Sequence, residues 1–139
     1  MAAHAHAEWH GGLKTGKGTF TAGDTLGGEF SFNSRFEDGP GASPEGLIGA
    51  ALAACFSMDL SAALERAGTP VESVKTDASV TLRRVDDKPT ITAIELKTVG
   101  SVPGLDEAAF AAAAQAAKGC IIARALAGVD EITLSAALA

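Results

Sequence analysis

Residues 43–58 read SPEGLIGAALAACFSM and predict the first turns of a long helix. Ser43 is a favourable N-cap residue, and Glu45 suits the positive end of the helix dipole. The helix is expected to extend to about Ala67, where Gly68 supplies a stop signal. Because its first half is apolar on most faces, we expect a buried central helix.

Alternating apolar and polar residues predict strands on both sides of this helix. The strands expected from this alternation lie at residues 4–10, 17–22, 29–36, 74–85, 90–99 and 131–138. Two further helices are expected at residues 106–118 and 120–127. This order of strands, long helix, strand pair, helices and strand predicts an α+β fold, because a parallel α/β fold would repeat βαβ units.

Length, charge and composition disfavour several classes of function. The 139 residues fit a single domain, 1–139, that can bury a core without disulfide staples. The net charge of −6 and the absence of tyrosine disfavour nucleic acids and anionic membrane surfaces as partners. No secretory signal is visible, and the apolar segment 47–63 is expected to be too short and too polar to span a membrane. We therefore expect a cytoplasmic protein with reduced thiols.

The chain has two cysteines, Cys55 and Cys120, in different surroundings. Cys55 lies in the apolar helix, where its plain interpretation is a small core residue. Cys120 follows a glycine at a predicted helix start, where unpaired backbone amides would favour a thiolate, and the alternative interpretation is an exposed thiol without a role. The two thiols together indicate a redox pair only if the fold brings them close, since a disulfide would close a long loop.

Arg35 and Glu45 are the charged residues that could serve a reactive Cys55. Arg35 stays charged when partly buried, although it is equally interpreted as a surface arginine. Glu45 could hold Arg35 through both carboxylate oxygens, or act only as a charge at the helix start. Ten residues of helix separate Glu45 from Cys55 by about 15 Å. If Glu45 is catalytic, an antiparallel symmetric dimer is therefore the natural solution.

Other chemistries find little support in the sequence. His4, His6 and His10 share one face of the first strand, but strand polarity explains this pattern without a metal. No Gly-rich phosphate loop, serine triad or Cys-x-x-Cys motif is present.

The chain resembles the OsmC/Ohr family, and most closely its OsmC branch. The resemblance rests on residues 43–58 above all, supported by residues 9–18, 30–37, 102–106 and 118–120. It covers essentially the whole chain. The resemblance implies an intertwined α+β homodimer, with antiparallel sheets wrapped around two long central helices and active sites at the subunit interface.

The same resemblance implies a thiol peroxidase that reduces organic hydroperoxides, and hydrogen peroxide more weakly, without metal, haem or flavin. Cys55 would be the peroxidatic thiolate and Cys120 the resolving cysteine of a Cys55–Cys120 disulfide. Arg35 would stabilise the thiolate and Glu45 would orient Arg35. A dithiol such as dihydrolipoamide, or a lipoylated protein, would reduce the disulfide.

The chain departs from the family after the second cysteine. Family members commonly carry proline and serine where this chain has Ile121 and Ala123, which affects how Cys120 is presented. Apolar side chains, such as Phe36, Phe56 and Met58, are expected to form walls near Cys55. The alternatives are a non-catalytic redox-sensing or small-molecule-binding dimer, and a structural alanine-rich dimerisation domain.

Overall fold

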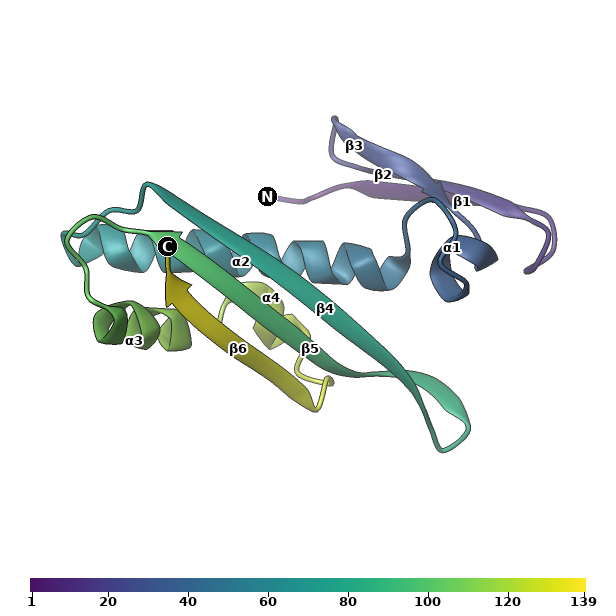
Figure 1. Cartoon of the computed structure of the whole chain (residues 1–139). Coiled ribbons are helices and arrows are strands. Elements are labelled where there is room, and N and C mark those ends of the chain that lie inside the picture. The colour runs from purple at the N-terminus through teal and green to yellow at the C-terminus, as the bar shows by residue number, and fades with distance from the viewer. The chain divides into compact units, whose positions relative to one another are not determined.

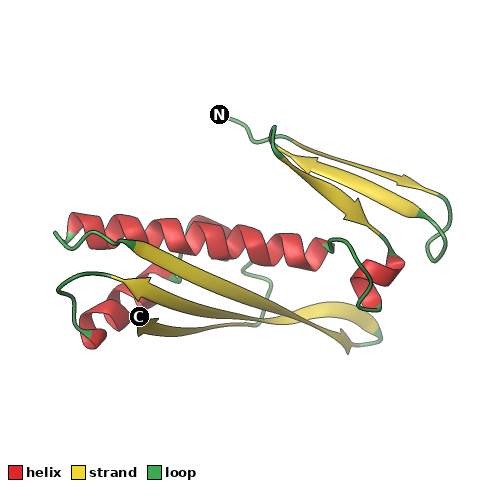
Figure 2. Cartoon of the chain, turned by 45° about the horizontal axis from the view of Figure 1, so that its top comes forward, coloured by secondary structure: helices red, strands yellow, loops and turns green.

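The computed structural model describes all residues from 1 to 139, and contacts divide the chain into two compact units. The first unit is Met1–Leu47 and the second is Ile48–Ala139. Each unit contains a sheet and helical segments (Figure 1, Figure 2). The expected α+β class is therefore confirmed.

The first unit contains a three-stranded antiparallel sheet in the order β1-β2-β3. Its strands are β1 (Ala5–His10), β2 (Lys17–Ala22) and β3 (Leu26–Phe30). The ring of Phe30 packs against Trp9 and Phe20, with centroid distances of 5.5 and 6.4 Å. Gly18 allows this packing, because a Cβ atom there would lie 2.5 Å from the Phe30 ring. The first two expected strands are thus confirmed.

The third expected strand, 29–36, is wrong in its second half. β3 ends at Phe30, and α1 (Phe32–Phe36) follows as a short helix. The Ser34 amide donates to Ser31 Oγ at 3.1 Å, and the Ser31 amide donates to Ser34 Oγ at 2.8 Å. This reciprocal capping box satisfies backbone amides locally, so it overrides the alternating pattern that favoured a strand.

The second unit contains a mixed three-stranded sheet in the order β4-β5-β6. Its strands are β4 (Ser73–Val85), β5 (Lys88–Ser101) and β6 (Glu131–Leu138). β4 and β5 form an antiparallel hairpin, in which Asp86 and Asp87 adopt φ of 49° and 64°, as a type I′ turn requires.

β6 pairs with β5 in parallel, so the expectation of purely antiparallel sheets is wrong in this unit. Along the chain, two helices connect β5 to β6, namely α3 (Glu107–Ala117) and α4 (Ile121–Ala125). They supply the long crossover that a parallel return needs. Asp106 caps α3 by accepting a hydrogen bond from the Ala109 amide at 2.8 Å.

α2 (Pro44–Arg66) runs along the second sheet (Figure 1). One stripe of its side chains packs in the core of the second unit. Its buried residues recur every three or four positions and are Gly49, Leu52, Phe56, Leu60 and Leu64. Gly49 permits a close approach, because a Cβ atom there would lie 3.2 Å from Val80 of β4. A second side of the helix is exposed within the single chain and consists of Ala50, Ala51, Ala54 and Met58. The expectation of burial on most faces is therefore not met within one chain.

By length and composition alone, α2 could cross a membrane, since an 18-residue window has a mean hydropathy of 1.8. The expectation that its apolar segment is too short and too polar is therefore wrong. Core helices meet the same criterion, and Leu52, Phe56 and Leu60 are fully buried. Packing on the sheet accounts for this apolar stripe.

Three hydroxyl groups join α2 to β4 and β5. Ser57 Oγ lies 2.8 Å from Thr76 Oγ1, which lies 3.0 Å from Thr98 Oγ1. Because Thr76→Val deprives two neighbouring hydroxyls of this partner, we expect it to lower the free energy of unfolding by about 1–3 kcal/mol. Urea unfolding measures the change, with the exposed Thr133→Val as the control. Equal stability of the two variants would contradict the prediction.

Candidate functional site

Arg35 and Glu45 form an ion pair in the first unit. Arg35 Nη2 donates to Glu45 Oε1 at 2.6 Å, and Arg35 Nε donates to Oε1 and Oε2 at 3.0 and 3.2 Å. The Glu45 side chain is 13% exposed and that of Arg35 is 40% exposed. The sequence-based expectation of a contact through both carboxylate oxygens therefore agrees with this geometry.

Glu45 is held as a carboxylate. Burial alone would raise its pKa, but the hydrogen bond from Arg35, the Glu45 backbone amide and the Arg35 charge together lower the pKa below its ordinary value. Glu45 also lies in the first turn of α2, where the helix dipole favours negative charge. The carboxylate can therefore restrain Arg35 at any pH near neutrality.

Local capping fixes the two residues in place. Ser43 Oγ accepts a hydrogen bond from the Gly46 amide at 3.0 Å, as expected for the N-cap of α2. Ser34 of α1 donates from its hydroxyl to the Ala42 carbonyl at 2.7 Å. The helix that carries Arg35 is thereby tied to the segment that leads to Glu45.

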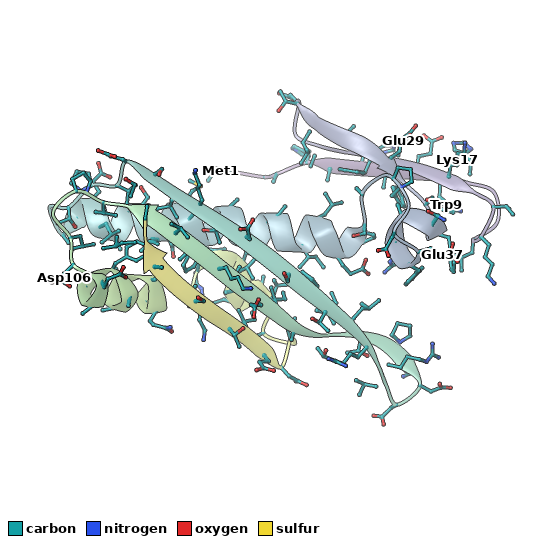
Figure 3. All side chains as sticks on the ribbon, viewed as in Figure 1. Met1, Trp9, Lys17, Glu29, Glu37 and Asp106 are labelled. Carbon is teal, nitrogen blue, oxygen red and sulfur yellow. The ribbon has the colours of Figure 1, made fainter.

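An apolar cavity of about 260 Å³ adjoins Arg35 in the first unit. Its lining residues are Trp9, Leu13, Phe30, Ser31, Phe32, Arg35, Phe36 and Pro44. Trp9 is labelled in Figure 3 and extends from β1. Sequence patterns alone do not identify Trp9, Leu13 or Phe30 as cavity residues, because they reach the cavity only through strand pairing and α1.

The three residues expected to form apolar walls near Cys55 lie in different surroundings. Phe36 lines the cavity beside Arg35. Phe56 is fully buried in the core of the second unit, so its expected place in an open wall is wrong. It belongs to the inward stripe of α2, whereas Met58 is 75% exposed on the same helix.

The two cysteines lie beside each other in the second unit as free thiols. Cys120 is 1% exposed and is the N-cap residue of α4, while Cys55 is half-buried on α2. Burial raises the pKa of the Cys120 thiol, the Ala123 amide opposes this rise, and neighbouring Cys55 raises the pKa further. The fold thus brings the two thiols close together, which a redox pair so widely separated in sequence requires.

The four predicted residues therefore come together as two pairs, one in each unit. Arg35 pairs with Glu45 in the first unit, and Cys55 lies beside Cys120 in the second. α2 contains both Glu45, in its first turn, and Cys55, ten residues later.

The histidine pattern of β1 forms a separate exposed cluster. Glu8 lies 2.5 Å from His10 Nε2 and 3.9 Å from His6 Nε2. No group of three or more His, Cys, Asp or Glu residues has an arrangement suited to a metal ion.

Comparison with known proteins gives consistent matches. The family model described as OsmC-like protein matches residues 37–135. Peroxiredoxin OsmC from Escherichia coli (strain K12) is 47% identical over 131 residues, which cover 92% of this chain and 90% of that protein. The protein of the same name from Shigella flexneri matches with the same identity and coverage.

Solved structures with low sequence identity share the fold. An organic hydroperoxide resistance protein OsmC from Legionella pneumophila superposes with a TM-score of 0.70 at 20% identity, covering 98% of this chain and 96% of that one. The organic hydroperoxide resistance protein OhrB of Bacillus subtilis superposes with a TM-score of 0.67 at 21% identity, covering 98% of each chain.

The lowered pKa of Glu45 predicts a pH-dependent contribution to stability. A carboxyl with a depressed folded pKa stabilises the fold above its unfolded pKa, and this contribution is lost as the pH falls through the folded pKa. We therefore expect Glu45→Gln to be less stable than the wild type from pH 7 to about 4.3, the ordinary pKa of glutamate, with a difference that shrinks at lower pH.

The midpoint of thermal unfolding across this pH range measures the difference. Glu65→Gln, at an exposed position near the end of α2, is the matched control. A Glu45→Gln deficit that stays constant down to pH 2 would show that the carboxylate charge is not its cause.

Proposed function

Because this chain belongs to the OsmC family and is a thiol peroxidase, we propose that it reduces organic hydroperoxides to alcohols through Cys55. The observation that carries the proposal is the 47% identity to Peroxiredoxin OsmC together with two free thiols that lie side by side. The organic hydroperoxide resistance proteins of Legionella pneumophila and Bacillus subtilis, which share the fold, support the choice of substrate class.

Cys55 is the proposed peroxidatic residue and Cys120 the proposed resolving residue. Cys55 is half-buried, so a peroxide can reach its sulfur, whereas Cys120 is 1% exposed. The raised pKa of Cys120 favours its protonated form, which does not compete with Cys55 for the peroxide.

The proposed cycle balances without a cofactor. The Cys55 thiolate attacks the terminal peroxide oxygen, the O–O bond breaks, and the alkoxide takes up a proton and leaves as an alcohol. Cys120 then attacks the Cys55 sulfenic acid, which releases water and forms the disulfide. An external dithiol reduces that disulfide by exchange and is itself oxidised. Dihydrolipoamide or a lipoylated protein is the reductant that we propose.

Arg35 is proposed to supply the positive charge, and Glu45 to orient it. Glu45 takes hydrogen bonds from Nε and Nη2 of Arg35, which leaves Nη1 to face the peroxide or the thiolate. A guanidinium stays charged throughout the cycle, so it can stabilise the Cys55 thiolate and the departing alkoxide.

A symmetric homodimer is proposed to join the two pairs into one active site, with residues 1–139 acting as one intertwined domain. Glu45 and Cys55 are separated by about 15 Å along α2, which is too far for both to reach one atom. The exposed side of α2 carries the small residues Ala50, Ala51 and Ala54, which let a second helix approach closely. Antiparallel contact through this side would bring Glu45 near Cys55 of the partner subunit.

The apolar cavity supports a preference for organic hydroperoxides over hydrogen peroxide. Its aromatic walls can bury an organic group next to Arg35, whereas hydrogen peroxide has no group to bury. Because the cycle requires reduced thiols between turnovers, we propose the cytoplasm as its location.

Cysteine substitutions test the proposed roles. In steady-state consumption of cumene hydroperoxide with dihydrolipoamide, we expect Cys55→Ser to lose activity by at least about 100-fold, because the nucleophile is gone. In a separate reaction without dithiol, we expect Cys120→Ser to release about one alcohol per subunit and then stop, with Cys55 held as a sulfenic acid. Mass spectrometry after dimedone labelling detects that adduct.

The two variants control for each other, since each retains one thiol. If wild type turned over as slowly as Cys55→Ser, a redox-sensing or binding role would replace catalysis. Full steady-state activity of Cys120→Ser would remove Cys120 from the cycle.

Charge on the exposed side of α2 tests the dimer. We expect Ala54→Glu to yield monomers in sedimentation velocity and to lose peroxidase activity, because two carboxylates would be buried where the helices meet. Ala112→Glu, at an exposed position of α3, should remain dimeric and active. A monomeric wild type, or an active monomeric Ala54→Glu, would contradict the shared site.

A further inference from the structure

The guanidinium group of Arg35 contacts Phe36 as well as Glu45. Arg35 Cζ lies 5.1 Å from the centroid of the Phe36 ring, within cation–π range. Glu45 occupies the edge formed by Nε and Nη2. The guanidinium is therefore restrained both at one edge and by an aromatic ring.

Packing in a hydrophobic core does not explain the aromatic side chain of Phe36. No residue of α1 is buried, and the Phe36 ring is 43% exposed. Its neighbours are Phe32, at a centroid distance of 5.0 Å, and the cavity that both rings line. The ring therefore makes its contacts with the cavity and with Arg35 and not with a buried core.

We propose that Phe36 is a positioning residue that fixes the orientation of Arg35 for reaction with the peroxide. This inference rests on the proposed function and adds a residue to its site. The ion pair with Glu45 holds one edge of the Arg35 guanidinium but still allows the group to rotate about that edge. The Phe36 ring, packed against the guanidinium, removes part of this rotational freedom. An organic group in the cavity packs beside the same ring.

The size of the effect follows from the contact. A cation–π contact at a partly exposed site corresponds to roughly a two- to fivefold change in an equilibrium. We therefore expect Phe36→Leu to lower kcat/KM by roughly two- to fivefold, with kcat carrying most of the loss. Leucine retains apolar volume in the cavity and lacks the π-face.

Hydrogen peroxide separates positioning from wall formation, because it has no organic group for the cavity. We expect Phe36→Leu to lower kcat/KM for hydrogen peroxide and cumene hydroperoxide by similar factors, and Phe36→Tyr to restore both. Leu13→Ala, which alters another wall of the same cavity, should affect cumene hydroperoxide more than hydrogen peroxide. Phe20→Leu, outside the cavity, controls for the general effect of this substitution.

A loss confined to cumene hydroperoxide, or a Phe36→Tyr variant no better than Phe36→Leu, would overturn the proposal.

NMR of the Arg35 side chain tests the proposal independently of turnover. We expect a ring-current shift of the Arg35 Nε–H signal in the wild type and in Phe36→Tyr that disappears in Phe36→Leu. If the wild type showed no Cys55-dependent turnover, the proposed function would fail while the NMR result still decided the contact.

Discussion

The packing of α2 on the second sheet is the constraint on which the proposed chemistry depends. The buried stripe that contains Leu52 and Phe56 fixes the rotation of the helix against the sheet. Cys55, next to Phe56, is thereby held half-buried beside Cys120. The helix rise places Glu45 about 15 Å from Cys55 along the same helix. A single chain therefore presents an arginine–glutamate pair and a thiol pair, and the proposed dimer unites them.

Electrostatics shifts the pKa values of Glu45 and Cys120 in opposite directions. Arg35 overcomes the burial of Glu45 and lowers the pKa of its carboxyl, so this pair stays ionised. Burial and the neighbouring Cys55 raise the pKa of Cys120, which favours the protonated form of this thiol. In the proposed cycle, the charged groups Arg35 and Glu45 lie where the peroxide reacts, whereas the resolving Cys120 is a neutral thiol.

Local signals predicted much of the fold, while long-range contacts decided the rest. The cap at Ser43 and the stop at Gly68 gave the bounds of α2 closely, because they depend on neighbouring residues alone. The segment 29–36 was misassigned because the Ser31–Ser34 capping box outweighs alternation. The parallel pairing of β6 depends on the crossover between it and β5, which alternation does not encode.

The candidate site shows the same division. The contact between Arg35 and Glu45 was predictable because a helix start lies just beyond the aromatic segment that carries Arg35. The cavity was not predictable, because Trp9 and Leu13 come from distant sequence. Phe56 was misplaced because the stripe of α2 that faces the sheet cannot be identified from a helix that is apolar on most faces.

Complementation between two inactive variants tests the shared active site most directly. Arg35→Met and Cys55→Ser are mixed, allowed to exchange subunits, and assayed for peroxidase activity. Each heterodimer would contain one intact site, made from Arg35 and Glu45 of one chain and both cysteines of the other. Random exchange should therefore restore about a quarter of the wild-type activity. Failure to exceed the activity of either variant alone, despite heterodimers verified by mass spectrometry, would contradict a site built from two subunits.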